Sequence, residues 1–224
     1  MAIDVDTKDC TSLSDAELVE LGDICTDGPA RIDIGMLSKQ REEWVLITQA
    51  RSSEGVEGFS FCTLERIGGT PSVLIGLASV RRSPDAGAVL AGLMGHQLRR
   101  AVLAFPDEDV LVGTRLIDPA GFEAFTAFME LEDVVPRPGH KATGEERAWG
   151  RRLAKRFGVD SGYRDREFVA EGDGSPPCVL DYASADPAAV DPEVRRFFEA
   201  VDVARGDCLV AFGWAMAEDL AALA

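Results

Sequence analysis

The sequence predicts an α/β protein with a mixed, mostly antiparallel sheet flanked by helices. Three β-rich runs follow one another at residues 44–50, 59–67 and 72–80, and short turns separate them. Strands joined by turns this short pair antiparallel. Segments with helical periodicity precede and follow these runs. With 46% hydrophobic residues, the chain can also fill a core between helices and sheet.

The first helix is predicted from Asp15 to about Cys25. Ser14 and Glu17 have the spacing of a capping box, which marks a helix start. A Gly-Pro pair at residues 28–29 would end the segment, because neither residue continues a helix well. A second, less regular helix is expected at residues 35–43.

The three β-rich runs are predicted to form a meander. A turn at residues 51–55 joins the first two runs, and a Gly-Gly-Thr-Pro hairpin at residues 68–71 joins the second to the third. Gly76 lies inside the third run. A glycine there weakens the ladder, and it often marks a bulge or a close approach of the backbone to another group.

The middle of the chain continues with helix, strand and helix. After a turn at residues 83–85, apolar residues from Leu90 to Val102 share one helical face, and Pro106 ends that helix. A buried strand is expected at residues 110–117. A further helix is predicted through Phe128, with Asp118 at its N-cap and a proline at its first position.

The last third is predicted to form an extension. An extended segment at residues 134–138 leads to a second capping box, Thr143 with Glu146, and its helix. A helix at residues 192–204 and an apolar strand at residues 208–214 follow. We therefore expect a core at residues 1–140, and an extension at residues 141–224 that completes the sheet or forms a partner surface.

Composition excludes several classes of function. The formal net charge of -16 repels phosphate backbones and anionic membranes, although a local basic patch remains possible. No apolar run approaches the roughly 18 to 20 residues that span a bilayer, and the acidic start is unlike a secretory signal, so we expect a cytoplasmic protein. Five widely spaced cysteines and two histidines form no metal-ligand pattern, which predicts buried thiols and no metal.

The succession of elements from Trp44 to Phe128 resembles the acyl-CoA-binding core of the GNAT acetyltransferases. The diagnostic segment of that family is a strand, a loop of pattern Q/R-x-x-G-x-G/A and a helix. Here the loop reads RSPDAG at residues 82–87. It matches at Arg82 and Gly87 but has Asp85 in place of the first glycine. The late segments DPEVRRFFEA and RGDCLVAFGW are similar to those of bacterial GNAT-like proteins with an extended C-terminal region.

The resemblance implies acetyl-CoA or another acyl-CoA as co-substrate. A helix N-terminus holds a pyrophosphate through its unpaired amides, and a bulged strand would offer backbone amides to the pantetheine arm. The carboxylate of Asp85 opposes this, because it repels a phosphate. The positions assigned to the cofactor are Leu77, Ala78, Ser79, Val80, Arg82, Ala86, Gly87, Ala88 and Asp118.

A second family segment, N-x-x-A-x-x-x-Y, aligns with DPAGFEAF at residues 118–125. Asp118 replaces the asparagine, and Phe125 replaces the tyrosine that usually protonates the leaving thiolate. Phenylalanine cannot donate a proton. The remaining candidates for catalysis are Glu65 as general base on an amine, and Tyr163 or Tyr182 as acid.

The resemblance implies acyl transfer from acyl-CoA to an amine of a small molecule or peptide. The alternative is a catalytically inactive GNAT-like binding or regulatory protein, which the substitutions Asp85, Asp118 and Phe125 favour. A third possibility is an unrelated α/β scaffold with an accidental match. We expect no nucleic-acid or membrane partner, and the oligomeric state, a homodimer included, stays open.

Overall fold

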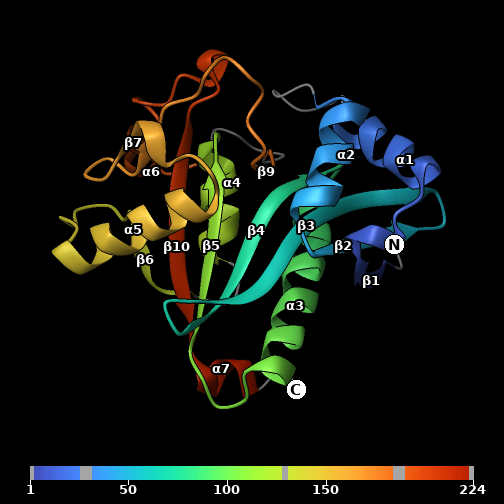
Figure 1. The fold of residues 1–224 in the computed structure, drawn as a ribbon, viewed down its shortest axis with the longest axis horizontal. Helices are drawn as coiled ribbons and strands as arrows, with labels where there is room; N and C mark the ends of the chain where they lie inside the picture. The colour runs from blue at the N-terminus through green and yellow to red at the C-terminus, as the bar shows by residue number, and fades with distance from the viewer. Residues whose placement is uncertain (1–2, 26–31, 128–130, 184–189, 222–224) are drawn as a thin grey trace.

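A computed structural model describes residues 3–25, 32–127, 131–183 and 190–221 (Figure 1). Within these residues, ten strands form one sheet in the order β1-β2-β3-β4-β9-β5-β10-β8-β7, and β6 pairs with β10. The strands are β1 (Asp4–Asp9), β2 (Leu46–Ser52), β3 (Gly55–Ile67), β4 (Thr70–Val80), β5 (Val110–Leu116), β6 (Glu132–Val135), β7 (Tyr163–Arg164), β8 (Val169–Ala170), β9 (Leu180–Asp181) and β10 (Cys208–Ala215).

Most strand pairs are antiparallel. The exceptions lie in the middle of the sheet, where β4, β9 and β5 run parallel to one another. The predicted fold class, a mixed and mostly antiparallel sheet flanked by helices, is confirmed. The strand predicted at residues 208–214 is confirmed as β10, which pairs with β5 along seven residues.

Helices cover both faces of the sheet (Figure 1). Helices α3 and α4 share a groove on one face, and α3 packs along β1 to β4. On the other face, Trp44 at the end of α2 contacts Phe157 at the end of α5, with ring centroids 6.3 Å apart. The helices are α1 (Asp15–Cys25), α2 (Ile34–Glu43), α3 (Ala86–Ala104), α4 (Pro119–Ala127), α5 (Gly144–Arg156), α6 (Pro192–Phe197) and α7 (Ala217–Ala221).

Both predicted capping boxes are present. The backbone N–H of Ser14 donates to the Glu17 carboxylate at 2.9 Å, and the backbone N–H of Glu17 donates to the Ser14 hydroxyl at 3.3 Å. Thr143 and Glu146 make the same reciprocal pair at the start of α5. The predicted end of the first helix at residues 28–29, and Phe128, the predicted end of the helix that Asp118 caps, lie outside the described residues.

Strand β1 and helix α6 differ from the sequence prediction. Strand β1 was not predicted, because its sequence DVDTKD is polar and acidic; it pairs with β2 at the edge of the sheet. The helix predicted at residues 192–204 is too long, since α6 ends at Phe197. The side chain of Asp202 accepts hydrogen bonds from the backbone of Ala204 and Arg205, so it starts a separate 3-10 turn.

None of the described helices is both long enough and apolar enough to cross a membrane. The thiols of four of the five cysteines are buried, and Cys178 is half-buried. Burial raises the pKa of the Cys10, Cys25 and Cys62 thiols to about 12, so these groups stay protonated and unreactive near neutral pH.

Candidate functional site

The bulge predicted at Gly76 is present in β4. Between the pairs Ser60↔Ala78 and Cys62↔Ile75, β4 contains one residue more than β3. A Cβ atom at Gly76 would lie less than 3.0 Å from three atoms of the Trp44 indole. Gly76 therefore combines the two roles expected of it, a bulge and a close approach. The indole is held in turn by a hydrogen bond from its Nε1 to Gln40 Oε1 at 3.0 Å.

The bulge lies where β4 and β5 separate. Before it, Ser72 to Leu74 of β4 pair directly with β5. Beyond it, the two-residue strand β9 lies between them: Leu180 pairs with Ala78 on one side and with Leu116 on the other. The backbone N–H of Ala78 donates to the Val179 carbonyl at 3.1 Å. A segment from the C-terminal extension thus fills the gap in the sheet.

Polar contacts fix the end of β9 on one face of the sheet. The Asp181 carboxylate accepts hydrogen bonds from Arg82 Nη2 at 2.8 Å and from the Ser79 hydroxyl at 3.0 Å. Asp181 is buried, so an unpaired charge there would be costly, and the Arg82 guanidinium provides its counter-charge. The arginine of the predicted phosphate loop is therefore paired with the protein's own carboxylate.

On the opposite face, β9 reaches the start of α3. The side chain of Leu180 packs against Gly121 of α4. A Cβ atom added at Gly87 would lie 3.5 Å from the Tyr182 hydroxyl oxygen, which is ordinary van der Waals contact. A shallow groove of about 240 Å³ remains between α3 and α4. It is lined by Gly87, Leu90, Ala91, Ala124, Ala127 and Tyr182.

The structure brings the predicted cofactor positions together along β4, the β4–α3 loop and the first turn of α3, with Asp118 at the start of the neighbouring α4. The Asp118 carboxylate accepts a hydrogen bond from the Ala120 backbone at 2.7 Å, as a helix cap does. With β9 in the sheet, the backbone N–H of Ala78 is bonded to Val179 and is not available to a pantetheine arm. Their assignment to the cofactor stays a prediction.

The three predicted catalytic residues are not brought together. Glu65 pairs with Ser72, whereas β9 begins opposite Ala78, so about 20 Å of strand separates Glu65 from β9. Glu65 is bound to Arg156 Nε at 2.6 Å. Tyr163 is on β7, at the far edge of the sheet, and burial raises the pKa of its hydroxyl. Tyr182 alone of the three adjoins β9.

Phe125 is fully buried and belongs to the hydrophobic core, together with Phe122 of the same helix. Phe122 packs on Phe197 and Phe198 of the α6 region, with ring centroids 5.7 and 6.5 Å apart. These phenylalanines therefore join α4 to the C-terminal extension.

Sequence reasoning missed β9. Its signal was a short apolar pair, Val179-Leu180, between a loop and a polar segment, and such a pair does not by itself indicate a strand. No group of three or more histidine, cysteine or acidic side chains that could hold a metal ion occurs within the described part of the chain.

No protein-family model and no curated protein matches this sequence. Several solved structures are similar to the chain. The ribosomal-protein-S18-alanine N-acetyltransferase from Escherichia coli is 10% identical over 95% of each chain, with a TM-score of 0.48. An N-acetyltransferase from Staphylococcus aureus Mu50 is 13% identical over 58% of this chain and 84% of its own, with a TM-score of 0.40. A chain of the NatC complex bound to Gag peptide and CoA is 14% identical over 56% of this chain and 82% of its own, with a TM-score of 0.40.

At these identities and TM-scores, the similarities say nothing about what this chain does. Its mixed, mostly antiparallel sheet and the succession β4, α3, β5, α4 agree with the GNAT-like fold class that the sequence resemblance implied.

Proposed function

We propose that this chain is a GNAT-like protein that acts as a binding or regulatory module and not as an acyl-CoA enzyme. The observation that carries the proposal is the position of β9, which occupies the gap between β4 and β5 and pairs with both strands. In a GNAT enzyme the amides of that part of β4 would be available to the pantetheine arm. Here the Ala78 amide donates to Val179.

The energetic cost of opening the gap supports this reading. Val179 and Leu180 are 0% and 1% exposed. Exposing both side chains would cost roughly 3–6 kcal/mol, at about 1.5–3 kcal/mol each. Because each 1.4 kcal/mol is a factor of ten in affinity, acyl-CoA would bind about 10² to 10⁴ times more weakly than to an open cleft.

The placement of the candidate catalytic groups supports it as well. Phe125 supplies no proton, Glu65 is paired with Arg156, and Tyr163 is on β7 at the sheet's far edge. Proton transfer needs a donor or acceptor within hydrogen-bond reach of the reacting atom. Among the three predicted groups, only Tyr182 adjoins the gap.

A thermal-shift titration with CoA and acetyl-CoA tests the proposal. A ligand bound by the folded state alone must raise the melting temperature. We expect no shift in the parent protein. We also expect none in Leu180→Ala, because Val179 and the Arg82–Asp181 ion pair still hold β9 in the gap. Leu103→Ala is the matched control, because Leu103 is 81% exposed on α3.

The second candidate is an acyl-CoA-dependent N-acyltransferase, with an amine acceptor, in which β9 is displaced when the co-substrate binds. The groove beside Gly87 favours it, since this groove adjoins the start of α3. A melting-temperature rise with acetyl-CoA in Leu180→Ala but not in Leu103→Ala would support a cleft that β9 closes. Acetyl transfer to a polyamine by the parent protein would overturn the non-catalytic proposal outright.

A further inference from the structure

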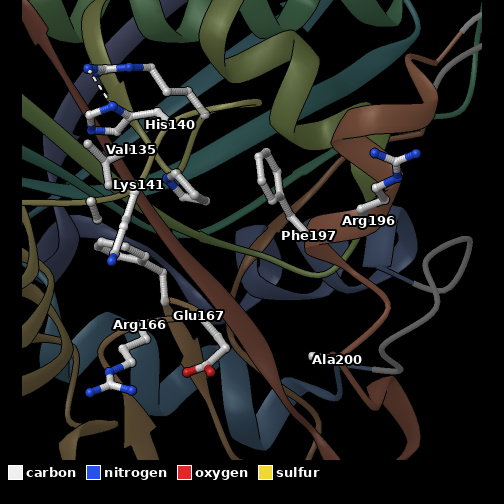
Figure 2. A pocket seen from close by; sticks show the side chains of 12 residues that line it. Val135, His140, Lys141, Arg166, Glu167, Arg196, Phe197 and Ala200 are labelled. Carbon is white, nitrogen blue, oxygen red and sulfur yellow. Dashed lines mark hydrogen bonds between the residues drawn. The ribbon is translucent and has the colours of Figure 1, made fainter.

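The C-terminal extension contains a second concave site, away from β9. It is a cavity of about 380 Å³ between the segment after β6, the turn after β7 and helix α6 (Figure 2). We call it the basic pocket. Its charged lining consists of Arg137, His140, Lys141, Arg166, Arg196 and the acidic Glu167. A volume of this size is typical of small-molecule sites.

The charge of this pocket is opposite to that of the whole protein. The chain carries 39 acidic and 23 basic residues, yet one acidic and four permanently cationic residues line this cavity. Cations gathered in a concave site with low-dielectric walls concentrate the local field and attract an anion. The strong negative charge elsewhere argues against a nucleic acid as that anion.

Some of these cations are already neutralised. Arg137 lies 3.4 Å from the Asp133 carboxylate and 3.7 Å from that of Glu146. Arg196 lies 2.9 Å from Glu193. The charges of these two arginines are therefore compensated within the protein.

Lys141 and Arg166 are different. Within the described part of the chain, neither side chain has a carboxylate within 4.0 Å or a hydrogen-bond partner. Both also line an adjoining hollow of about 340 Å³, together with Arg147, whose Nε donates to the Thr143 carbonyl at 3.3 Å. In Figure 2, Lys141 and Arg166 lie on the same side of the basic pocket, and Phe197 lies across from them.

The other part of the lining is apolar. Val135 and Phe168 are 0% and 2% exposed, and the half-buried Phe197 is held against Phe122. Because Val135 and Phe168 are almost fully buried, the Phe197 ring is the apolar surface that a ligand would cover, and covering it is favourable at about 25 cal/mol per Å². The pocket thus has a cationic side and an aromatic side.

We propose that the basic pocket binds a small organic phosphate monoester with an apolar, ring-sized body. The phosphoryl group would face Lys141 and Arg166, and the body would lie on Phe197. A dianion suits these two cationic side chains better than a monocarboxylate does, because charge-assisted hydrogen bonds to phosphate oxygens engage several donors at once. This site is independent of β9 and of acyl-CoA.

Isothermal titration with phenyl phosphate tests the proposal. We compare the parent with Lys141→Gln/Arg166→Gln and with Arg99→Gln/Arg100→Gln, a matched control that makes the same charge change at two exposed arginines of α3. We expect saturable binding that weakens about tenfold or more in the first variant, as for the loss of charged hydrogen bonds, and remains unchanged in the control. The four substituted side chains are all exposed, so both variants should fold.

Two further ligands define the chemistry. Phenol lacks the phosphoryl group and inorganic phosphate lacks the ring, so we expect each to bind more weakly than phenyl phosphate. The proposal is overturned if the parent does not bind phenyl phosphate, if both double variants weaken binding equally, or if inorganic phosphate binds as tightly as phenyl phosphate.

Discussion

Gly76 lies where β4 bulges and where the Trp44 indole covers the strand. A side chain there has no free volume, because protein interiors are packed about as densely as organic crystals. The indole cannot easily move away, since it is bonded to Gln40 and the Arg156 guanidinium stacks on it at 5.4 Å. The backbone at this position is thus fixed by its neighbours.

We predict that Gly76→Ala lowers the free energy of unfolding by about 1–3 kcal/mol, the usual cost of overpacking a core. Urea denaturation measures it. The control is Gly144→Ala at the start of α5, where an added Cβ meets nothing within 4 Å. A midpoint for Gly76→Ala equal to that of this control would contradict the packing around Trp44.

Asp207 is a buried carboxylate that organises the loops before β10. It accepts hydrogen bonds from the backbone N–H groups of Gly172, at 2.9 Å, and Asp202, at 3.1 Å, and it is paired with Arg205. The Arg205 guanidinium and these amides lower the pKa of Asp207 to about 2. The folded protein therefore favours the ionised form.

Folding lowers the pKa of Asp207, so its ionised carboxylate stabilises the folded state fully above the unfolded pKa of about 3.9. This stabilisation is lost as the pH falls towards 2. We predict that Asp207→Asn is less stable than the parent at about pH 6, and that the difference shrinks by about pH 3. Urea midpoints at both pH values measure it. Asp4→Asn, at an exposed position of the edge strand β1, serves as control. A difference that grows on acidification would contradict the assignment.

At the residue scale, the sequence predicted those features that are determined by residues adjacent in the chain. Gly76 was identified because a glycine inside a β-rich run is unusual. The partner of Arg82 was not predictable, because Asp181 is far away in sequence and no local pattern joins the two. The unpaired Lys141 and Arg166 were likewise hidden by a charge count that is strongly negative overall.

At the scale of the element, the cap of α5 gives a direct test. The Thr143 hydroxyl accepts a hydrogen bond from the Glu146 backbone at 3.1 Å, and the Glu146 carboxylate accepts one from the Thr143 backbone at 2.6 Å. We predict that Thr143→Ala costs roughly 0.5–2 kcal/mol, whereas Thr143→Ser, which keeps the oxygen, costs much less. Chemical denaturation compares the two. Equal losses would mean that the methyl group, and not the cap, is what matters.

Helix starts were predictable because a capping box is contained in four consecutive residues. Strands β7, β8 and β9 contain two residues each, which is too short for any periodicity to appear. Strand β9 depends on the edges of β4 and β5, β8 depends on the edge of β10, and β7 pairs with β8. The end of α6 was misplaced for a related reason, since Asp202 competes for the following backbone amides.

At the scale of the whole molecule, the net charge of -16 opposes compactness through self-repulsion. Salt screens this repulsion, with a Debye length that falls from about 30 Å at 0.01 M to about 3 Å at 1 M. We predict that the urea midpoint rises with added NaCl, and equally with KCl, because screening does not depend on the ion. A midpoint that stays constant or falls would indicate that the surface ion pairs outweigh the repulsion.

The succession of strands and helices along the first 128 residues predicted the fold class, because each element carries its own pattern and the connections between them are short. The sequence could not predict that a late segment would enter the middle of the sheet. That outcome depends on the three-dimensional fit of Val179 and Leu180 in the gap between β4 and β5.

The position of β9 also has a consequence for the order in which the protein is made. When β4 and β5 have emerged from the ribosome, the strand that belongs between them has not yet been synthesised. Until it arrives, the two strands present unpaired edges, which are sites of unwanted association in a nascent chain. Contacts between residues so distant in sequence also slow folding. The central sheet of this protein must therefore be completed late, after most of the chain has been translated.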